Sequence, residues 1–149
     1  MSIGGKTFDE ALGALHDMTG GMVAIGRDEH LQRIARAQVR MRELGLAAIW
    51  LNAGTNLTYF TGTKWHPSER MVGAILPASG ALEYIAPAFE ECTLQGFMQV
   101  EGPVNCWEEH ESPYQLFIDV LNRIGIAASE SAPPRIGMCE SAPWFIADG

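Results

Sequence analysis

The stretch LAAIWL, residues 46–51, decides the fold class of this sequence. Every residue in it is apolar, and such a continuous run is typical of a strand that is buried on both faces of a sheet. Two further apolar runs, MVGAIL (residues 71–76) and LEYIA (residues 82–86), flank the turn-forming residues PASG. Two strands separated in this way predict a β-hairpin.

Apolar residues at helical spacing predict two helices before this run. In the first, Thr7 and Glu10 form a capping box and residues 19–21 (TGG) end the helix. Its apolar residues are Phe8, Ala11, Leu12, Leu15 and Met18. The second helix covers about residues 28–44, with Gly45 as its C′ residue. Its apolar face consists of Leu31, Ile34, Met41 and Leu44. We expect both helices to be amphipathic and to pack on the sheet.

The rest of the sequence continues this alternation. The segment NAGTNLTYFTG (residues 52–62) predicts a short helix or an irregular turn, and residues 89–97 predict a helix. PVNCW (residues 103–107) predicts a short strand. RIGMC (residues 135–139) predicts a last strand after the loop ASESAPP (residues 128–134). Helices that alternate with buried strands, together with one hairpin, predict an α/β domain with a mixed sheet.

A strong helix start lies at Ser112-Pro113-Tyr114-Gln115. Ser112 is the expected N-cap, Pro113 occupies the first helical position, and Gln115 completes a capping box. Gly125 is expected to end this helix. Its predicted apolar face consists of Tyr114, Phe117, Ile118, Leu121 and Ile124.

Length and charge exclude several classes of protein. The 149 residues suggest one domain. No apolar run approaches the roughly 20 residues that span a bilayer, and the N-terminus lacks the apolar core of a secretory signal. The net charge is −8, and residues 27–43, with five arginines against three acidic residues, net +2. Such a diluted basic face is weak support for nucleic-acid binding. We expect a cytoplasmic protein that binds neither nucleic acid nor membrane.

The cysteines show no metal or disulfide pattern. Cys92, Cys106 and Cys139 are odd in number, and no pair has C-x-x-C spacing. We interpret them as buried, reduced thiols. The sequence also lacks the G-x-S-x-G, G-x-G-x-x-G and P-loop patterns, so neither a serine-hydrolase elbow nor a nucleotide site is indicated.

The segment WEEHES, residues 107–112, combines three carboxylates with a histidine. These side chains are metal ligands in many proteins. Ligands on consecutive residues point in divergent directions, however, and acidic residues just before a helix favour the positive end of its dipole. The helix-start interpretation is therefore preferred to a metal site.

The segment TGTKWHPSER, residues 61–70, is the main candidate for a binding loop. Pro67 disfavours a regular helix or a central strand, and loops carry functional residues more often than scaffold elements do. Trp65 offers a flat apolar face for a ring, while His66 and Arg70 are suited to hold a carboxylate. In the alternative interpretation, Trp65 covers the edge of the core and Arg70 pairs with Glu69. The residues alone leave both interpretations open.

Four stretches, in this order, are similar to a known family. They are RIARAQVRMRELGLAAIWLNAGTNLTYFTG (residues 33–62), SERMVGAILPASGALEYIAPAFEE (residues 68–91), WEEHESPYQLF (residues 107–117) and RIGMCESAPWFIADG (residues 135–149). Together they resemble the N-terminal domain of the creatinase/prolidase superfamily. The closest likeness is to bacterial Xaa-Pro dipeptidases and to aminopeptidase P.

The resemblance implies a two-domain parent protein. Residues 27–149 would form the smaller N-terminal domain, an RNase H-like α/β domain with a mixed sheet of about six strands, and residues 1–26 a helical extension. The catalytic pita-bread domain is absent from this chain. That domain would hold two divalent metal ions (manganese, cobalt or zinc) on Asp, Asp, His, Glu and Glu. We therefore expect no catalytic residue, no metal site and no peptidase activity in this chain alone. Its end at Asp148-Gly149, directly after an apolar run, fits a longer protein.

In this family the N-terminal domain builds much of the dimer contact, and its loop after the T-G turn leans over the partner's active site. Residues 62–70 match that loop. The resemblance implies that Trp65 packs against the prolyl ring of a dipeptide substrate, and that His66 and Arg70 receive its terminal carboxylate. The implied partners are the chain's own catalytic domain, a second copy in a homodimer, and the dipeptide.

Two alternatives to this interpretation stay open. The parent protein could be a creatinase-like amidinohydrolase or an inactive relative, because those proteins differ in the catalytic half. The chain could also be a free-standing module that uses the Trp65 loop to bind a small anionic ligand.

Overall fold

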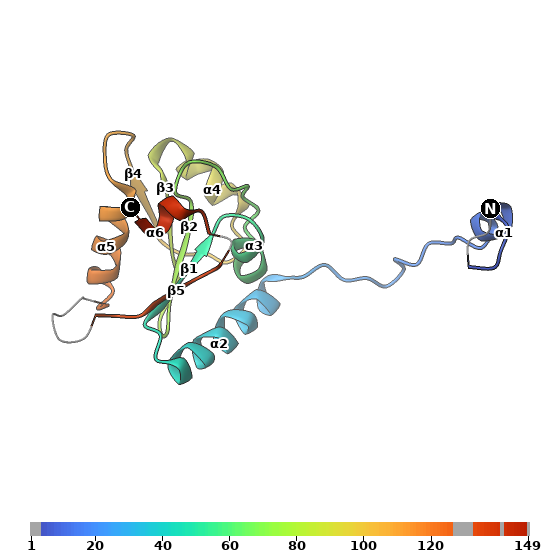
Figure 1. Cartoon of the computed structure of the whole chain (residues 1–149), viewed down its shortest axis with the longest axis horizontal. Coiled ribbons are helices and arrows are strands. Elements are labelled where there is room, and N and C mark those ends of the chain that lie inside the picture. Colours follow the sequence, from blue (N-terminus) through green and yellow to red (C-terminus); the bar gives the residue numbers. More distant parts are fainter. Residues whose placement is uncertain (1–3, 127–132, 141, 149) are drawn as a thin grey trace.

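A mixed sheet with helices on both faces forms the body of the protein in the computed structural model, which describes residues 4–126, 133–140 and 142–148 (Figure 1). Its strands are β1 (Ala48–Asn52), β2 (Gly73–Pro77), β3 (Glu83–Pro87), β4 (Val104–Trp107) and β5 (Ile136–Met138). Their order is β4-β3-β2-β1-β5. The predicted α/β class is confirmed. The described residues form five strands, where the resemblance implied about six.

The hairpin and the buried strand follow the predicted pattern. β2 and β3 pair antiparallel, as do β1 and β2, whereas β1–β5 and β3–β4 are parallel pairs. Trp50 in β1 lies opposite Ile75 in β2 and Met138 in β5. Because successive side chains of a strand point to opposite faces, Leu51 packs in one core layer and Trp50 in the other. β1 is therefore covered on both faces, as its sequence predicts.

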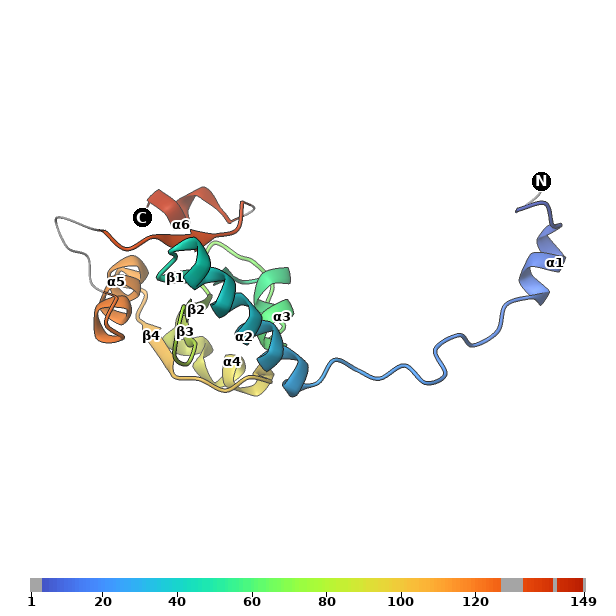
Figure 2. The same ribbon diagram turned by 90° about the horizontal axis from the view of Figure 1, so that it is seen from below.

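Helices cover the two faces of the sheet (Figure 2). One core layer contains side chains of α2 (Arg27–Leu44), α3 (Thr55–Thr61) and α4 (Glu91–Phe97), which follows a 3-10 turn (Ala88–Glu90). The other contains side chains of α5 (Pro113–Arg123) and Ile146 of α6 (Trp144–Asp148). The ring of Phe117 in α5 meets that of Trp50 edge-on, with centroids 5.6 Å apart. No helix in the described part of the chain is long and apolar enough to cross a membrane.

The predicted start and end signals of α2 and α5 are largely confirmed. Gly45 ends α2 with φ +65°, and the amide of Leu46 donates to the carbonyl of Met41, which forms a Schellman motif. Ser112 caps α5 by accepting from the amide of Gln115 at 3.2 Å. The predicted capping box does not close, because the side-chain amide of Gln115 donates to Asp119 instead.

Three of the predicted apolar-face residues of α2 and α5 lie outside the core. Ile34 and Met41 of α2 are buried, but Leu31 and Leu44 are 38% and 45% exposed. Ile118 of α5 is 47% exposed, while its neighbour Val120 is buried. The helical spacing marks the side of each helix that meets the sheet, but part of each apolar stripe stays exposed.

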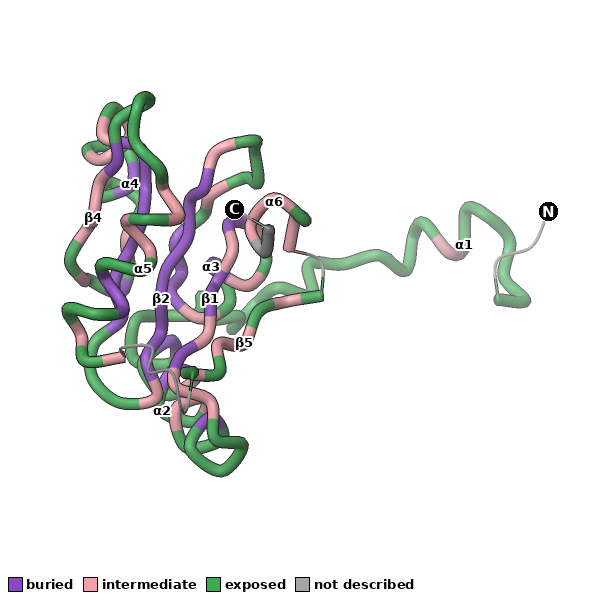
Figure 3. The backbone as a smooth tube through the Cα atoms, turned by 60° about the vertical axis from the view of Figure 1, so that its left-hand side comes forward, coloured by how far each residue is buried: buried purple, intermediate pink, exposed green. Residues whose placement is uncertain are grey.

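The first helix is shorter than predicted and does not pack on the sheet. Its capping box is confirmed, since the amide of Thr7 donates to the carboxylate of Glu10 at 2.8 Å and the Thr7 hydroxyl accepts in return. However, α1 (Phe8–Gly13) ends well before Met18 and contains no buried residue. Figures 1 and 3 show it away from the body, at the end of an extended exposed segment. Most helical stability in proteins comes from packing, which α1 lacks. The helix therefore does not extend to Met18. We call residues 4–26 the arm.

The cysteine interpretation was wrong in part. Cys92 is exposed, and Cys106 and Cys139 are half-buried. Cys92 lies in the first turn of α4, whose core contact is made by Leu94 instead. The loop predicted at residues 128–134 falls mostly outside the described residues.

Candidate functional site

The candidate loop begins at a point that is fixed in the core. Gly62 ends α3 with φ +74°, and its amide donates to the carbonyl of Thr58 at 2.9 Å. The next residue, Thr63, is fully buried, and its hydroxyl lies 3.2 Å from that of Tyr84. Tyr84 in turn donates to the carbonyl of Val100 at 2.7 Å. Burial raises the pKa of Tyr84 more than the hydroxyl groups of Thr63 and Thr61 lower it, so the phenol stays a donor.

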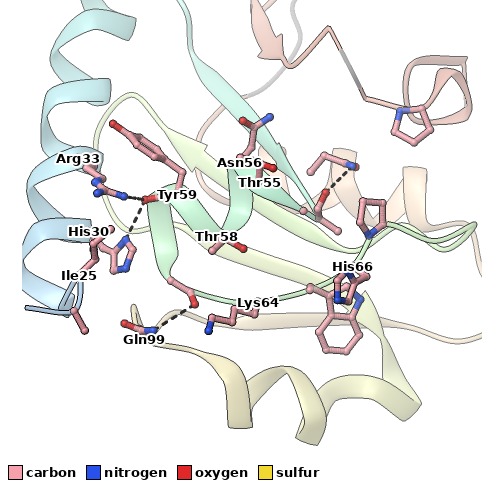
Figure 4. Close-up of a pocket in the computed structure, with 18 residues that line it drawn as sticks. Ile25, His30, Arg33, Thr55, Asn56, Thr58, Tyr59, Lys64, His66 and Gln99 are labelled. Carbon is pink, nitrogen blue, oxygen red and sulfur yellow. Dashed lines mark hydrogen bonds between the residues drawn. The ribbon is translucent and has the colours of Figure 1, made fainter. Parts of the chain in front are cut away.

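An open cavity of about 1090 Å³ lies beside this loop (Figure 4). Its walls come from the base of the arm, α2, the end of β1, α3, the loop itself, Gln99 and Pro143. Of the sequence-predicted site residues, Trp65 and His66 line this cavity together with Pro67, whereas Arg70 does not. The fold thus brings two of the three candidates to one place.

Trp65 both packs on the core and faces the cavity. Its side chain is half-buried against the core layer that contains α2, α3 and α4. Its ring meets that of Phe97 at 75°, with centroids 6.3 Å apart. The interpretation of Trp65 as a cover for the core edge is confirmed. Its wall position also leaves ring surface that a ligand can contact.

Arg70 ties the far end of the loop to the segment before α5. Its Nε donates to Oε1 of Glu109 at 2.9 Å, and its Nη1 forms an ion pair with Glu69. The predicted Arg70–Glu69 pair is therefore confirmed. The hydrogen bonds from Arg70 lower the pKa of Glu109, and those to Glu109 raise the pKa of Arg70. The guanidinium is engaged by two carboxylates and does not reach the cavity lining.

The acidic segment before α5 serves as an anchor. Glu109 pairs with Arg70, and the carboxylate of Glu111 accepts from the amide of Glu108 at 2.9 Å. The indole nitrogen of Trp107 donates to the carbonyl of Met71, just beyond the loop. Among the described residues, no group of three or more His, Cys, Asp and Glu side chains is placed to hold a metal ion. The donor set that a metal pair needs is not assembled in this part of the chain.

Residues of α2 that the sequence analysis did not select also line the cavity. His30 is only 3% exposed, and its Nδ1 lies 3.0 Å from the carbonyl oxygen of Tyr59. Arg33 donates to the same oxygen at 2.9 Å, lies over the Tyr59 ring and pairs with Glu29. The sequence offered one indication that His30 is buried: it lies four residues before Ile34, on the buried face of α2.

Comparisons with known proteins agree with this fold. A family model described as the creatinase/prolidase N-terminal domain matches residues 33–148. The chain is 30% identical over 108 residues to the probable dipeptidase PepE of Mycobacterium tuberculosis (strain H37Rv), and equally to that of Mycobacterium bovis. The match covers 70% of this chain and 29% of PepE, so the chain spans less than a third of the length of these curated relatives.

Solved structures show the same arrangement of elements. Dipeptidase PepE from Mycobacterium ulcerans superposes with a TM-score of 0.70 at 25% identity, over 85% of this chain and 33% of that one. Prolidase from Thermococcus sibiricus gives 0.62 at 25% identity, over 85% and 31%. The N-terminal domain of Xaa-Pro dipeptidase from Lactobacillus brevis gives 0.64 at 17% identity, over 74% and 78%, which is a likeness of fold. Since the family model covers most of its length, the chain belongs to the creatinase/prolidase N-terminal domain family.

Proposed function

We propose that this chain is the non-catalytic N-terminal domain of a Xaa-Pro dipeptidase-type metallopeptidase and that it works in the cytoplasm. Support comes from the family match and from dipeptidases and a prolidase among the similar proteins. In this proposal, a following catalytic domain supplies two divalent metal ions, which activate water and polarise the bond before proline. The described residues of this chain offer no such ligand group.

The loop from Gly62 to Arg70 carries the functional part of the proposal. It is fixed at one end through Thr63 in the core and at the other by the Arg70–Glu109 ion pair. Between these anchors, the loop presents Trp65 and His66 at the wall of an open cavity. A loop held at both ends can position side chains over a neighbouring active site with little loss of entropy.

This geometry suggests a role for each residue in substrate gating. Trp65 packs against the prolyl ring of the dipeptide, because a half-buried indole presents a flat apolar face at low entropic cost. His66 is exposed and can hydrogen-bond to the terminal carboxylate. Arg70 contributes by holding the loop, since its guanidinium is already paired. We further propose that the full-length protein is a homodimer in which the loop reaches the partner's active site.

The test uses the full-length protein that contains this domain. We expect Trp65→Ala to lower kcat/KM for Xaa-Pro dipeptides by about tenfold, because ring packing is lost, while the bound metal content stays the same. Phe8→Ala, which removes an exposed ring from the arm, is the matched control and should leave kcat/KM unchanged. An unchanged kcat/KM in Trp65→Ala would retire the gating role.

A second assay tests the domain assignment itself. The purified 149-residue chain should not hydrolyse Xaa-Pro dipeptides in the presence of manganese, because its described residues assemble no metal ligand group. Robust hydrolysis by this chain would overturn the assignment. If the full-length protein hydrolyses creatine and not dipeptides, the creatinase-like alternative replaces the dipeptidase.

A further inference from the structure

The cavity contains a buried histidine with one nitrogen unused. His30 is 3% exposed, and its Nδ1 pairs with the carbonyl oxygen of Tyr59 at 3.0 Å. A carbonyl oxygen only accepts, so Nδ1 must carry the hydrogen, and in the neutral ring Nε2 is a hydrogen-bond acceptor. Nε2 has no partner among the described residues. Among the described residues, every side-chain nitrogen or oxygen that is closed off from solvent has a hydrogen-bond partner. Because Nε2 has no partner, it must be accessible, and we place its accessible side in the cavity that His30 lines.

A second acceptor lies next to this nitrogen. A Cβ atom built on Gly62 would lie 2.8 Å from Nε2 of His30 and 2.7 Å from Cδ of Gln99, so both side chains flank the same point. The Gln99 amide nitrogen is oriented toward the carbonyl of Gly62 at 3.5 Å, which leaves Oε1 as its acceptor. This end of the cavity therefore offers two acceptor atoms to a ligand that carries N–H groups.

A cation lies at the same end. Figure 4 shows Lys64 extending from the loop toward Gln99 and His30, while His66 lies at the opposite end. Lys64 takes part in none of the ion pairs found in the described part of the chain, whereas Arg33 is paired with Glu29. None of the described residues that line the cavity is an aspartate or a glutamate. A carboxylate that enters it therefore meets an ammonium group and no repelling charge.

Most of the lining surface is apolar, although polar side chains such as Asn52, Thr55 and Asn56 also line the cavity. The apolar residues of the lining include Ile25 at the base of the arm, Ala53, Trp65 and Pro67. A ligand that satisfies His30 and Lys64 must also place its body against these walls. A compact apolar ring with an N–H and a carboxylate on adjacent atoms meets all three requirements.

We propose that this chain by itself binds a small cyclic or apolar α-amino acid in the cavity. Its ammonium or imino group donates to Nε2 of His30, its carboxylate pairs with Lys64, and its side chain packs against the apolar part of the lining. In the described part of the chain, the site takes its lining from residues between 24 and 99 and from Pro143. It therefore does not depend on the proposed peptidase role or on a second domain.

The first experiment compares three ligands of one shape by calorimetry on the 149-residue chain. L-Proline has the N–H and the carboxylate, cyclopentanecarboxylate has only the carboxylate, and pyrrolidine has only the nitrogen. We expect proline to bind with a millimolar Kd or tighter, as its size allows, and each of the other two to bind at least about tenfold more weakly. No detectable binding of proline, or equal binding of cyclopentanecarboxylate, would overturn the proposal.

Variants locate the site on the chain. The sequence contains two lysines, so Lys64→Met removes the cavity cation that forms no ion pair with a described residue, and Lys6→Met, in the arm, is its matched control. We expect Lys64→Met to weaken proline binding about tenfold and Lys6→Met to leave it unchanged. Equal affinity in the two variants would place proline elsewhere and overturn the assignment.

The role of His30 needs a substitution that keeps the fold. In His30→Asn, the side-chain amide can still donate to the Tyr59 carbonyl from the position of Nδ1, but the acceptor at Nε2 is lost. We expect weaker proline binding with a thermal unfolding midpoint close to that of the unmodified chain. In the unmodified chain, the ¹⁵N signal of Nε2 should shift on titration with proline. A signal that stays in place while proline binds would contradict the contact. A negative result in these titrations would overturn only the amino-acid site. The proposed gating role is tested separately, by the kinetic effect of Trp65→Ala in the full-length protein.

Discussion

At the scale of the residue, the least expected feature is a charge inside the sheet. Glu83 of β3 is 7% exposed, yet it is ionised between Arg123 of α5 and Asn105 of β4. Burial raises the pKa of Glu83, but the hydrogen bonds from Arg123 and Asn105 outweigh it and lower the pKa overall. If one of these partners is removed, a buried charge is left uncompensated, and the folded state loses stability.

Removing the partner of Glu83 should therefore destabilise the domain. We expect Arg123→Met to lower the free energy of unfolding by about 1–3 kcal/mol, less than for a fully buried pair because Arg123 is half exposed. Arg36→Met, on the exposed side of α2, is the control and should change it by less than about 0.5 kcal/mol. Urea unfolding measures both, and equal effects would show that the pair contributes nothing.

The same pair should make stability depend on acid. The folded-state pKa of Glu83 is lowered, so its contribution is present above the unfolded-state pKa of about 4.3 and is lost as pH falls through the folded value. Arg123→Met removes the main cause of that lowering. The difference in unfolding free energy between the two proteins should therefore shrink as pH falls from about 5 to 3. A constant difference across this range would contradict the linkage.

At the scale of the element, similar local signals have different consequences. Thr7 and Ser112 both cap a helix, and both side-chain oxygens accept from an amide three residues later. α5 packs on the sheet through Val120 and Leu121, whereas α1 has no buried residue. A cap contributes to global stability only if its helix is part of the cooperative unit.

This contrast predicts opposite outcomes for one kind of substitution. Ser112→Ala should lower the free energy of unfolding by about 1 kcal/mol, while Thr7→Ala should leave it within about 0.5 kcal/mol. Chemical unfolding followed by tryptophan fluorescence measures both. An equal loss in Thr7→Ala would mean that α1 unfolds together with the body.

Glycine at the end of α3 gives a second matched pair. Gly62 has φ +74°, and an added Cβ would meet His30 and Gln99 at less than 3 Å. Gly96, inside α4, has no atom within 4 Å of such a Cβ. We expect Gly62→Ala to cost about 2–4 kcal/mol, through backbone strain and overpacking. Gly96→Ala should stabilise by about 0.5–1 kcal/mol. Similar thermal midpoints in the two variants would contradict this account.

At the scale of the whole molecule, two core layers enclose one sheet, and the candidate site lies at the end of strand β1. The cavity takes its walls from segments as distant as Ile25 and Pro143. Figure 3 shows burial concentrated in the strands, and the arm is exposed apart from the half-buried Ala11. The body therefore holds the site, and the tip of the arm adds nothing to its packing.

Deleting residues 1–20 tests this division. The described residues of this segment are all exposed except the half-buried Ala11, and Ile25 of the cavity wall is retained. We expect the free energy of unfolding to change by less than about 0.5 kcal/mol. Urea unfolding with the full chain as control measures this. A loss above about 1 kcal/mol would show that the tip of the arm packs on the body.

The sequence by itself determined the elements whose signals are local. The buried run at residues 46–51 and the hairpin on either side of PASG follow from apolar patterns, and the ends of α2 and α5 follow from Gly45 and Ser112. The loop with Trp65, His66 and Arg70 was also recognised, because Pro67 excludes regular structure there. Such signals act over a few residues, so a linear pattern contains them.

Only the tertiary structure decided which of these elements and side chains meet. Phe8 and Ile34 both follow a helical pattern, yet only Ile34 finds a sheet to pack on. Arg70 was a candidate for a substrate carboxylate, but Glu109, 39 residues away, is close enough to pair with it. His30 joins the cavity through a carbonyl 29 residues away. These contacts form because the packed core brings segments together that are far apart in the sequence. No local pattern of residues specifies which distant segments will meet.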